Sequence, residues 1–572
     1  MHTLIIDLEC DGFKPTTIWC LWASFDGTYT GFTDGEAFNE YLQSLPTPCT
    51  VYAHNGLAFD YPILERLWGC DFSEFILHDS LVMSRLANPS REGGHSLKSW
   101  GARLGYPKGD HSDWSQFSEE MYNYCEQDVA VTSEVLVALQ SELSGFSPES
   151  INLEHETAAV LAKQVSRGWR LRVRDAYDLM AKLTERKMDL EDTVRSTFVP
   201  YPQAIKEVTP KMKADGSFSR VGLNAYAENL DSVGGAFTLL DYPVFNLGSR
   251  KQIGEYLIRF GWKPTKLTPK GQPIVDEGTL NGVEIPEAQM IAEYMLLQKR
   301  LAMVNSWVEA VDDDDRVHGR VNSCGANTRR MTHNSPNVAQ VPASRSPYGS
   351  ECRKLWTVAD GCALVGADAD ALELRCLAHY MNDPEYIDTV LNGDVHTANQ
   401  EAAGLPTRDD AKTFIYAFLY GAGDALIGDL VGGGAKAGKE VKRRFLESTP
   451  ALATLRNNVE RASGRGWLKC IDGGRVKVRS QHSALNTLLQ SAGAVFMKQA
   501  LVTADEYAVR NALDFGWVGN IHDELQAEVS EAHSGRFARL VEGSFAAAGD
   551  KLGFRIPMTG TAQIGESWYD TH

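Results

Sequence analysis

Short runs that alternate apolar and polar positions dominate the first 150 residues. Strand-like runs lie at residues 4–9, 17–25 and 49–54, and a longer run with helical period covers residues 118–143. This alternation of strands and helices predicts an α/β unit. The polar, proline-containing stretch 144–152 predicts the boundary of that unit.

The next stretch is mainly helical. Residues 154–168 and 174–198 predict two helices joined by a short strand, and the second is long and charged on one face, as in an arm or thumb. Residues 198–246 carry no clear period and are expected to be irregular. Helical patterns resume at 249–261 and 287–311.

The last 250 residues mix both patterns without an internal repeat. Strand patterns cover 362–369, 467–480 and 518–529, and helical patterns cover 371–381, 408–421 and 484–508. We therefore expect a multidomain protein with α/β and α+β parts.

Composition narrows the class of protein. The chain has 572 residues, 43% of them hydrophobic and 23% charged, as in a globular protein of three or four domains. No apolar run approaches the roughly 20 residues of a membrane span, and the start MHTLIIDLECDGF lacks a basic flank, so we expect a soluble, intracellular protein. The ten cysteines contain no CxxC pair, which argues against structural zinc.

The charge is distributed unevenly. A net charge of −19 argues by itself against a nucleic-acid partner. However, residues 1–150 hold 22 Asp and Glu against 7 Lys and Arg, and so carry most of the excess acid. The rest of the chain is close to neutral and has cations enough to present a basic groove to nucleic acid.

Four carboxylates in the first unit have a spacing that suits metal ions. Asp7 and Glu9 are two apart on a strand and therefore face the same side. Asp60 and Asp128 follow, and Tyr124 lies on the same helix face as Asp128. Two divalent ions about 3.5–4 Å apart need such a cluster, and the phenol would orient the attacking water. Any one of these acids alone is better explained as a helix cap or a solvated side chain, but an acid inside the apolar strand at position 7 is costly to bury unless it coordinates something.

Two further acids lie near strand ends in the last 250 residues. The strand 362–369 ends near Asp368, and Glu373 lies in the helix that follows. Asp523 belongs to a His-Asp-Glu run that interrupts an otherwise apolar strand or hairpin. A carboxylate at the end of a strand suits a metal ion, although the tripeptide alone is a weak signal.

A cationic stripe lies between these two acids in the sequence. Arg408, Lys412 and Tyr416 are four residues apart and share one helix face. Two cations beside an aromatic ring suit a triphosphate and a base. The alternative is a solvated face with a core tyrosine.

These patterns resemble two known families. The order DxE, HNxxxxD and YxxxD resembles the three motifs of DnaQ-type 3′→5′ proofreading exonucleases, over residues 1 to about 140. The segments around Asp368, 408–421 and around Asp523 resemble motifs A, B and C of family A DNA polymerases. Further segments resemble the replicative polymerases of T-seven-like short-tailed phages, namely 154–169, 244–257, 318–349, 392–400 and 484–494.

The resemblance implies a role for each matched residue. Each of two active sites would hold two magnesium ions, for which Mn²⁺ could substitute. In the polymerase site the ligands and catalytic acids would be Asp368 and Asp523. In the exonuclease site they would be Asp7, Glu9, Asp60 and Asp128, with Tyr124 as a catalytic partner. Lys412 would be catalytic and would also contact the nucleotide, together with Arg408, Tyr416, His396, Glu373 and Tyr420. Glu373 would exclude ribonucleotides by crowding the sugar. The primer-template DNA would be contacted by Arg330, Asn486, Gln490 and His522.

The resemblance also implies an architecture. We expect an RNase H-like exonuclease domain at 1–145, followed by a right-hand polymerase. Its parts would be a thumb at 151–300 with a shortened insertion at 198–246, a palm at 301–384 and 482–572, and fingers at 385–481. The expected function is template-directed DNA synthesis with proofreading during phage replication, in the cytoplasm of an infected bacterium. The expected partners are primer-template DNA, dNTPs and a phage helicase-primase, without a membrane.

The chain departs from the family pattern in three places. Asp370 stands where a small residue is usual, and either metal binding or hydrogen bonding would explain it. Arg329 replaces the glycine that usually precedes Arg330. The insertion at 198–246 lacks the long basic run of the thioredoxin-binding relatives, which argues against dependence on thioredoxin.

Two other functions are open to a chain with these motifs. A single-subunit RNA polymerase shares the palm, but Glu373 and an exonuclease unit argue against it. A DNA-binding replication scaffold with inactive sites has no need for the seven acids that this chain retains.

Overall fold

The chain divides into two compact units. The computed structural model describes residues 2–219, 223 and 234–572. One unit comprises the residues up to Arg172 together with Ala310–His572, and the other is Val173–Glu309. Within the described residues, no helix is both long enough and apolar enough to cross a membrane.

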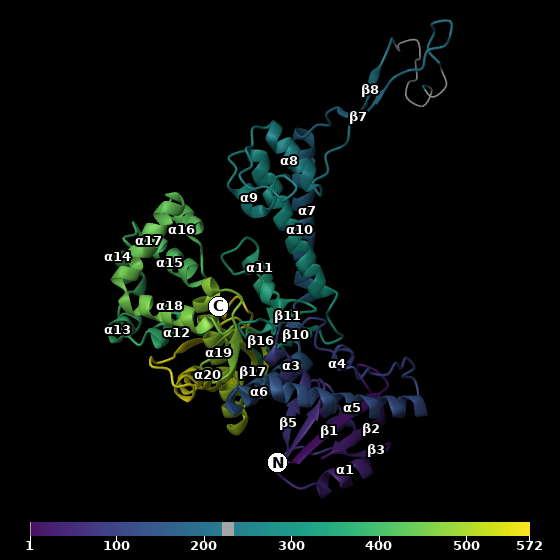
Figure 1. Cartoon of the computed structure of the whole chain (residues 1–572), viewed down its shortest axis with the longest axis vertical. Coiled ribbons are helices and arrows are strands. Elements are labelled where there is room, and N and C mark those ends of the chain that lie inside the picture. Colours follow the sequence, from purple (N-terminus) through teal and green to yellow (C-terminus); the bar gives the residue numbers. More distant parts are fainter. Residues whose placement is uncertain (1, 220–222, 224–233) are drawn as a thin grey trace. The chain divides into compact units, whose positions relative to one another are not determined.

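A five-stranded sheet forms the centre of the first 150 residues (Figure 1). Its spatial order is β3 (Thr28–Phe32), β2 (Ile18–Phe25), β1 (His2–Cys10), β4 (Cys49–Ala53) and β5 (Ile76–Asp79). β1 is antiparallel to β2 and parallel to β4, which is parallel to β5. The predicted strands are confirmed, and β1 lies in the middle of the sheet.

Helices cover both faces of this sheet, because its strands carry apolar side chains on both sides. One core joins the sheet to α1 (Gly35–Ser44) and α2 (Asp60–Trp68). A second core joins it to α3 (Ser80–Ala87), α4 (Leu97–Leu104) and the predicted helix α5 (Glu119–Glu142).

Helix α6 (Pro148–Arg167) begins earlier than the sequence pattern indicated. The side chain of Ser147 accepts a hydrogen bond from the backbone N–H of Ser150, and Pro148 occupies the first turn, where its missing N–H costs nothing. The stretch 144–152, predicted as a boundary, is therefore helical from Pro148 onward.

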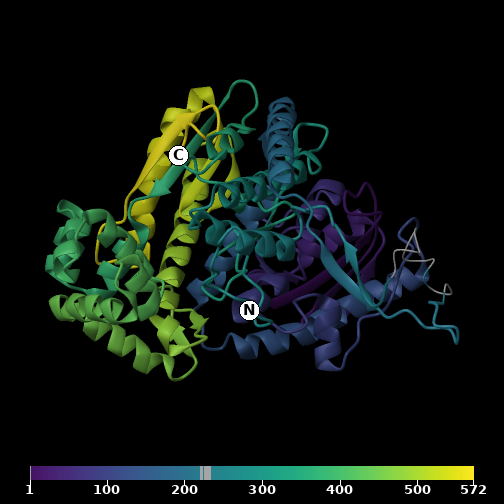
Figure 2. The same ribbon diagram turned by 90° about the horizontal axis from the view of Figure 1, so that it is seen from above.

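A four-stranded antiparallel sheet organises the last 250 residues. Its order is β16 (Phe515–Ile521), β17 (Glu524–Ser530), β13 (Cys362–Ala369) and β18 (Gly560–Gly565). Helix α20 (Glu531–Lys551), yellow in Figure 2, packs on β13 and β18 and against the long helix α19 (Ala484–Arg510). Shorter strands form two small sheets: β12 (Trp356–Thr357) with β6 (Trp169–Leu171) and β9 (Arg316–Val317), and β10 (Arg320–Asn322) with β11 (Thr332–Asn334).

A cluster of helices follows α12 (Leu372–Met381), and it is green in Figures 1 and 2. It contains α13 (Pro384–Asn392), α14 (Val395–Ala403), α15 (Arg408–Leu419), α16 (Asp424–Leu430), α17 (Gly434–Ser448) and α18 (Pro450–Ser463), and ends in the hairpin of β14 (Trp467–Lys469) and β15 (Arg475–Lys477). α16 and α17 approach closely, because a Cβ on Gly438 would lie 2.0 Å from the carbonyl oxygen of Asp424. Gly438, within α17, therefore serves the packing of these two helices.

The second unit is mainly helical. It contains α7 (Val173–Thr197), α8 (Arg250–Arg259), α9 (Glu277–Asn281) and α10 (Pro286–Val308). α7 packs along α10, where Arg186 pairs with Glu293 at 2.8 Å. β7 (Gln203–Val208) and β8 (Phe237–Asp241) form an antiparallel pair, so the irregular structure expected for 198–246 is wrong for these strands. Residues 220–222 and 224–233 of that stretch lie outside the described residues.

A buried charge cluster joins distant parts of the first unit. It contains Glu154 in α6, Arg329, Lys498 in α19 and Asp472 in the β14–β15 turn, and none of their side chains is more than 2% exposed. Arg329 donates to both Asp472 oxygens, at 2.9 and 2.7 Å, and to Glu154 at 3.2 Å. Lys498 donates to both Glu154 oxygens at 2.8 Å. Buried charges of this kind are tolerated because each has an opposite partner.

Candidate active sites

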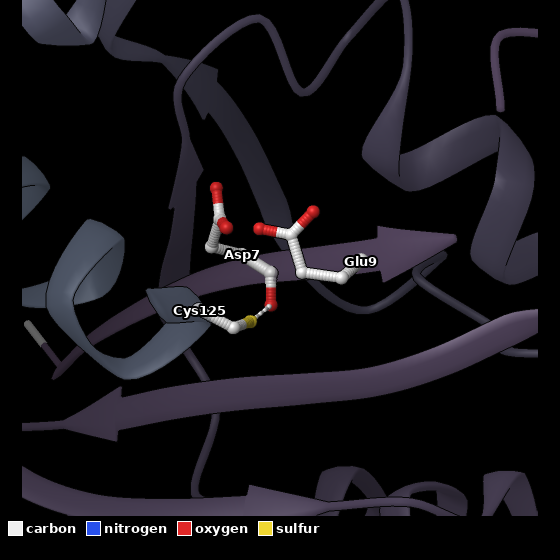
Figure 3. Close-up of side chains that lie close together, drawn as sticks. All are labelled: Asp7, Glu9 and Cys125. Carbon is white, nitrogen blue, oxygen red and sulfur yellow. Dashed lines mark hydrogen bonds between the residues drawn. The ribbon is translucent and has the colours of Figure 1, made fainter. Parts of the chain in front are cut away.

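Four carboxylates meet beside strand β1. Asp7 and Glu9 project from β1 to the same side (Figure 3). Asp60 is the first residue of α2, and Asp128 lies in α5. Besides burial, repulsion from Asp128, Glu9 and Asp60 holds the pKa of Asp7 well above its usual range. The structure thus brings together four acids that are up to 121 positions apart in the sequence, from Asp7 to Asp128.

The pKa values of the other acids in this cluster are raised as well. Burial, followed by repulsion from Asp128, raises the pKa of Glu9 to about 9. Burial and then Asp79 raise the pKa of Asp60 to about 7, and burial outweighs a lowering by Lys108 to bring the pKa of Asp128 to about 6. A cation bound between such carboxyl groups would favour their ionised forms and lower these pKa values.

One oxygen of Asp128 is available for such a cation. The Asp128 side chain is 2% exposed, and its Oδ2 pairs with the ammonium of Lys108. Its Oδ1 is buried and accepts no hydrogen bond. An unpartnered buried carboxylate oxygen beside three more carboxylates is a donor set of the kind that Mg²⁺ and Mn²⁺ bind. The residues present therefore fit a divalent metal ion.

Cys125 lies close to this cluster but has a packing role. Its Sγ and one carboxylate oxygen each of Asp7 and Glu9 lie within 4.8 Å of one another. However, the thiol donates a hydrogen bond to the backbone carbonyl of Asp7 at 3.1 Å (Figure 3). This contact fastens α5 to β1. Tyr124, the preceding residue, is half-buried, and the Lys108 ammonium lies 4.7 Å from the centre of its ring.

Two residues beside this acid cluster were not predicted from the sequence. Asp79, 2% exposed, accepts hydrogen bonds from the backbone N–H groups of Asn55, Leu57 and Leu81 at 2.9, 3.2 and 2.8 Å. It thereby fixes the turn that leads to Asp60. Its place between a strand and a helix is a capping signal in the sequence. Lys108, in the loop between α4 and α5, carries no comparable signal.

Asp368 and Asp523 lie side by side at one end of the four-stranded sheet. Asp368 of β13 is opposite Glu524 of β17. The backbone N–H of Ala369 bonds the carbonyl of Asp523 at 3.0 Å. Partial burial, then repulsion from Asp523 and Glu524, raises the pKa of Asp368 to about 7. Both are hard oxygen donors, so this pair also fits divalent cations.

Asp370 is held by hydroxyl groups. Its carboxylate accepts hydrogen bonds from Thr559 at 2.7 Å and from Thr561 at 3.2 Å. Its backbone N–H also bonds the carbonyl of Thr559 at 3.0 Å. Of the two explanations left open for Asp370, metal binding or hydrogen bonding, these contacts support hydrogen bonding.

The cationic stripe of α15 faces α14. Arg408 pairs with Asp394, the N-cap of α14, at 2.6 Å. Burial and the charges of Arg408 and Lys412 lower the pKa of His396. The His396 and Tyr416 rings have their centres 6.2 Å apart. The four predicted nucleotide contacts on these two helices are thus neighbours.

Glu373 links α12 to the end of α15. Its Oε1 accepts a hydrogen bond from the hydroxyl of Tyr420 at 3.1 Å and one from Arg330 at 3.4 Å. Tyr420 caps α15, and Gly421 follows with φ +78°. This left-handed position favours glycine.

A cavity of about 350 Å³ opens beside these groups. Its lining includes Arg330, Glu373, His522, Asp523 and Gly493 of α19. His522 is exposed at φ +60°, in the turn between β16 and β17.

The other two predicted DNA contacts lie near the start of α19. Asn486 and Gln490 are both half-buried, and neither lines this cavity. The Oδ1 of Asn486 is buried without a hydrogen-bond partner.

Comparisons with known proteins agree over most of the chain. The sequence profile of DNA polymerase family A matches residues 224–570. The DNA-directed DNA polymerase of Enterobacteria phage T3 is 34% identical, with both chains covered completely. The DNA-directed DNA polymerase of Escherichia phage T7 is 35% identical over 94% of this chain and 95% of its own length.

The fold has a counterpart among solved structures. The polymerase domain of Pol1 from M. smegmatis, solved with DNA primer-template and dNTP, matches with a TM-score of 0.77 at 17% identity, covering 100% of this chain and 96% of its own. At this identity the likeness concerns the fold. The profile and the two phage relatives decide the family. The chain belongs to DNA polymerase family A and is a DNA-directed DNA polymerase.

Proposed function

We propose that the four-stranded sheet carries the polymerase site, with Asp368 and Asp523 as the ligands of two Mg²⁺ ions. Family A DNA polymerases generally use divalent metal ions. The observation that carries the proposal is the hydrogen bond between Ala369 and the Asp523 carbonyl, which keeps the two carboxylate-bearing backbones adjacent. When bound, the ions would supply activation of the primer 3′ hydroxyl and stabilisation of charge on the α-phosphate.

The cations of α15 would bind the triphosphate of an incoming dNTP. Arg408 offers a planar fork and Lys412 a point charge, which suits the shifting charge of phosphoryl transfer. His396 would add a donor to the phosphates, and Tyr416 and Tyr420 would flank the new base pair. Glu373, held by Tyr420 and Arg330, would meet the sugar at its 2′ position and disfavour ribonucleotides.

Contacts to primer-template DNA would come from polar groups near the cavity and on α19. Arg330 and His522 line the cavity, and Asn486 lies near the start of α19 with a side-chain amide that can donate. Together with Gln490 they would donate hydrogen bonds to minor-groove acceptors of the primer-template or contact the primer end. The minor-groove acceptors are common to all correct base pairs, so such contacts test the geometry of a pair and not its sequence.

We further propose that residues 1–145 form a 3′→5′ exonuclease. Asp7, Glu9, Asp60 and Asp128 would hold two divalent ions, and Tyr124 would orient the water that attacks the terminal phosphodiester. The unpartnered Oδ1 of Asp128 and the repulsion of Asp7 by the other three carboxylates support this role. Proofreading would then remove a mispaired primer end.

The remaining assignments complete the proposal. We assign the thumb to 151–300, the palm to 301–384 and 482–572, and the fingers to 385–481. The protein would act on phage-type DNA in the cytoplasm of an infected bacterium, where a helicase-primase is a candidate partner. The stretch 198–246 lacks a long basic run, which favours independence from thioredoxin.

Two substitutions test the two-site proposal. We expect Asp523→Ala to abolish nucleotide incorporation on a primed template and to leave single-strand degradation intact. Asp7→Ala should do the reverse. Both activities are measured on labelled oligonucleotides, with circular dichroism as the control for folding. If either substitution removed both activities from a folded protein, the division into two sites would be wrong.

A further inference from the structure

Lys108 is the cation that faces the acid cluster of the five-stranded sheet. Its ammonium pairs with Oδ2 of Asp128 and lies 4.7 Å from the ring centre of Tyr124. The Lys108 side chain is 21% exposed, so its charge is largely removed from water. It is therefore positioned to affect any other cation that enters the cluster.

The backbone around Lys108 is fixed without help from the ammonium. The Tyr106 N–H bonds the Gly101 carbonyl at 2.9 Å, and the Gln127 side chain bonds the Pro107 carbonyl at 3.3 Å. A Cβ on Gly101 would lie 2.6 Å from the Tyr106 carbonyl, so the loop lies directly on α4. Removing the charge of Lys108 should thus leave the loop in place.

The two oxygens of Asp128 are differently engaged. Oδ2 is occupied by Lys108, whereas Oδ1 is buried and unpartnered. A metal ion bound through Oδ1 and the ammonium of Lys108 on Oδ2 would share the same carboxylate group. Like charges at such a separation repel strongly where water is largely excluded.

We propose that Lys108 weakens and thereby sets the affinity of the Asp7–Glu9–Asp60–Asp128 cluster for divalent metal ions. It offsets one of the four negative charges that the cluster carries when all its carboxyl groups are ionised, and it repels the incoming ion. This inference rests on the proposed exonuclease site and adds a residue that limits its metal binding. In consequence the site would depend more on the phosphate of the bound DNA strand to retain its ions.

The test measures Mn²⁺ binding to the full chain by electron paramagnetic resonance. The double variant Asp368→Asn, Asp523→Asn serves as the background, because it removes the two acids of the other site. We expect Lys108→Met in this background to bind Mn²⁺ about tenfold more tightly. The magnesium concentration that half-saturates single-strand degradation should fall by a similar factor when measured with Lys108→Met in an otherwise unaltered chain.

Two control variants separate charge from general effects. Lys108→Arg keeps the charge and should bind Mn²⁺ within about twofold of the background. Lys98→Met makes the same charge change in the same domain, at a lysine whose side chain is 75% exposed and pairs with Asp110 at 3.1 Å, and should have no effect. Unchanged or weaker Mn²⁺ binding by Lys108→Met would overturn the inference.

A further variant distinguishes failure of this inference from failure of the exonuclease proposal. Asp7→Asn in the same background should lose the Mn²⁺ that the cluster holds. If the intact cluster and Asp7→Asn bind equal amounts of Mn²⁺, the cluster holds no ion, and the exonuclease site and the role of Lys108 both fail. If only the response to Lys108→Met is missing, the site stands and Lys108 does not limit its metal affinity.

Discussion

Replacing Arg329 by methionine should destabilise the first unit through Asp472. Arg329 is 1% exposed and supplies the charge that pairs with the Asp472 carboxylate, which is 2% exposed. Methionine has a similar length but leaves that carboxylate buried without its cation. Glu154 retains Lys498, so one charge loses its partner rather than two.

The expected loss of unfolding free energy follows from the single unpaired carboxylate. Removing one partner of a buried pair costs about 3–5 kcal/mol, because an uncompensated charge stays in the interior. Arg329 has φ +61°, and methionine inherits the same backbone strain, so strain does not change the difference. With a urea dependence of about 3 kcal/mol/M, the unfolding midpoint should fall by roughly 1–1.7 M.

The assay is equilibrium unfolding in urea, followed by tryptophan fluorescence. Hydrogen exchange in residues 148–167 and 467–477 reports locally on the two segments that Arg329 joins. Asp472→Asn is the matched second substitution. The double variant Arg329→Met, Asp472→Asn removes both charges of the pair. We expect the double variant to recover more than half of the loss.

Two results would refute this reasoning. A cost below about 1 kcal/mol for Arg329→Met would mean that water or another group compensates Asp472. A double variant no more stable than Arg329→Met would mean that the charge of Asp472 is not the cause.

Three further predictions follow from individual contacts. Glu373→Ala should increase ribonucleotide incorporation at least tenfold relative to dNTPs, because it removes the group expected at the 2′ position; primer extension with each substrate measures the ratio. Asp370→Ala should retain polymerase activity within about tenfold while lowering the thermal midpoint by a few degrees, because its carboxylate is engaged by Thr559; an activity loss as complete as that of Asp523→Ala would contradict this. Burial lowers the pKa of His78 to about 3, so between about pH 6.5 and pH 3 the unfolded chain binds a proton at this residue and the native chain does not. The free energy of unfolding should therefore decline below pH 6.5 by up to about 1.4 kcal/mol per pH unit. Urea unfolding of His78→Asn at several pH values should show a shallower pH dependence.

Local pattern and motif order predicted much of the architecture. The acid pair on β1 and the helix α5 were predictable because strand and helix periods are visible within short windows. The pairing of β7 with β8 was not, since its register depends on contacts across an intervening stretch with no clear period. Side-chain partners that come from distant segments were also invisible in the sequence. The pairing of Lys108 with Asp128, and that of Asp370 with its two threonines, arise only when distant segments meet.

The position of β13 in the four-stranded sheet has a consequence for folding during synthesis. Both neighbours of β13 are made late, because β17 begins at Glu524 and β18 at Gly560. Until the ribosome has released those segments, the hydrogen-bonding edges of β13 stay open while the helices α13 to α18 are translated. The sheet around Asp368 can therefore form only when translation is nearly complete, and a chain interrupted before Glu524 would expose the unpaired edges of β13 at the proposed polymerase site.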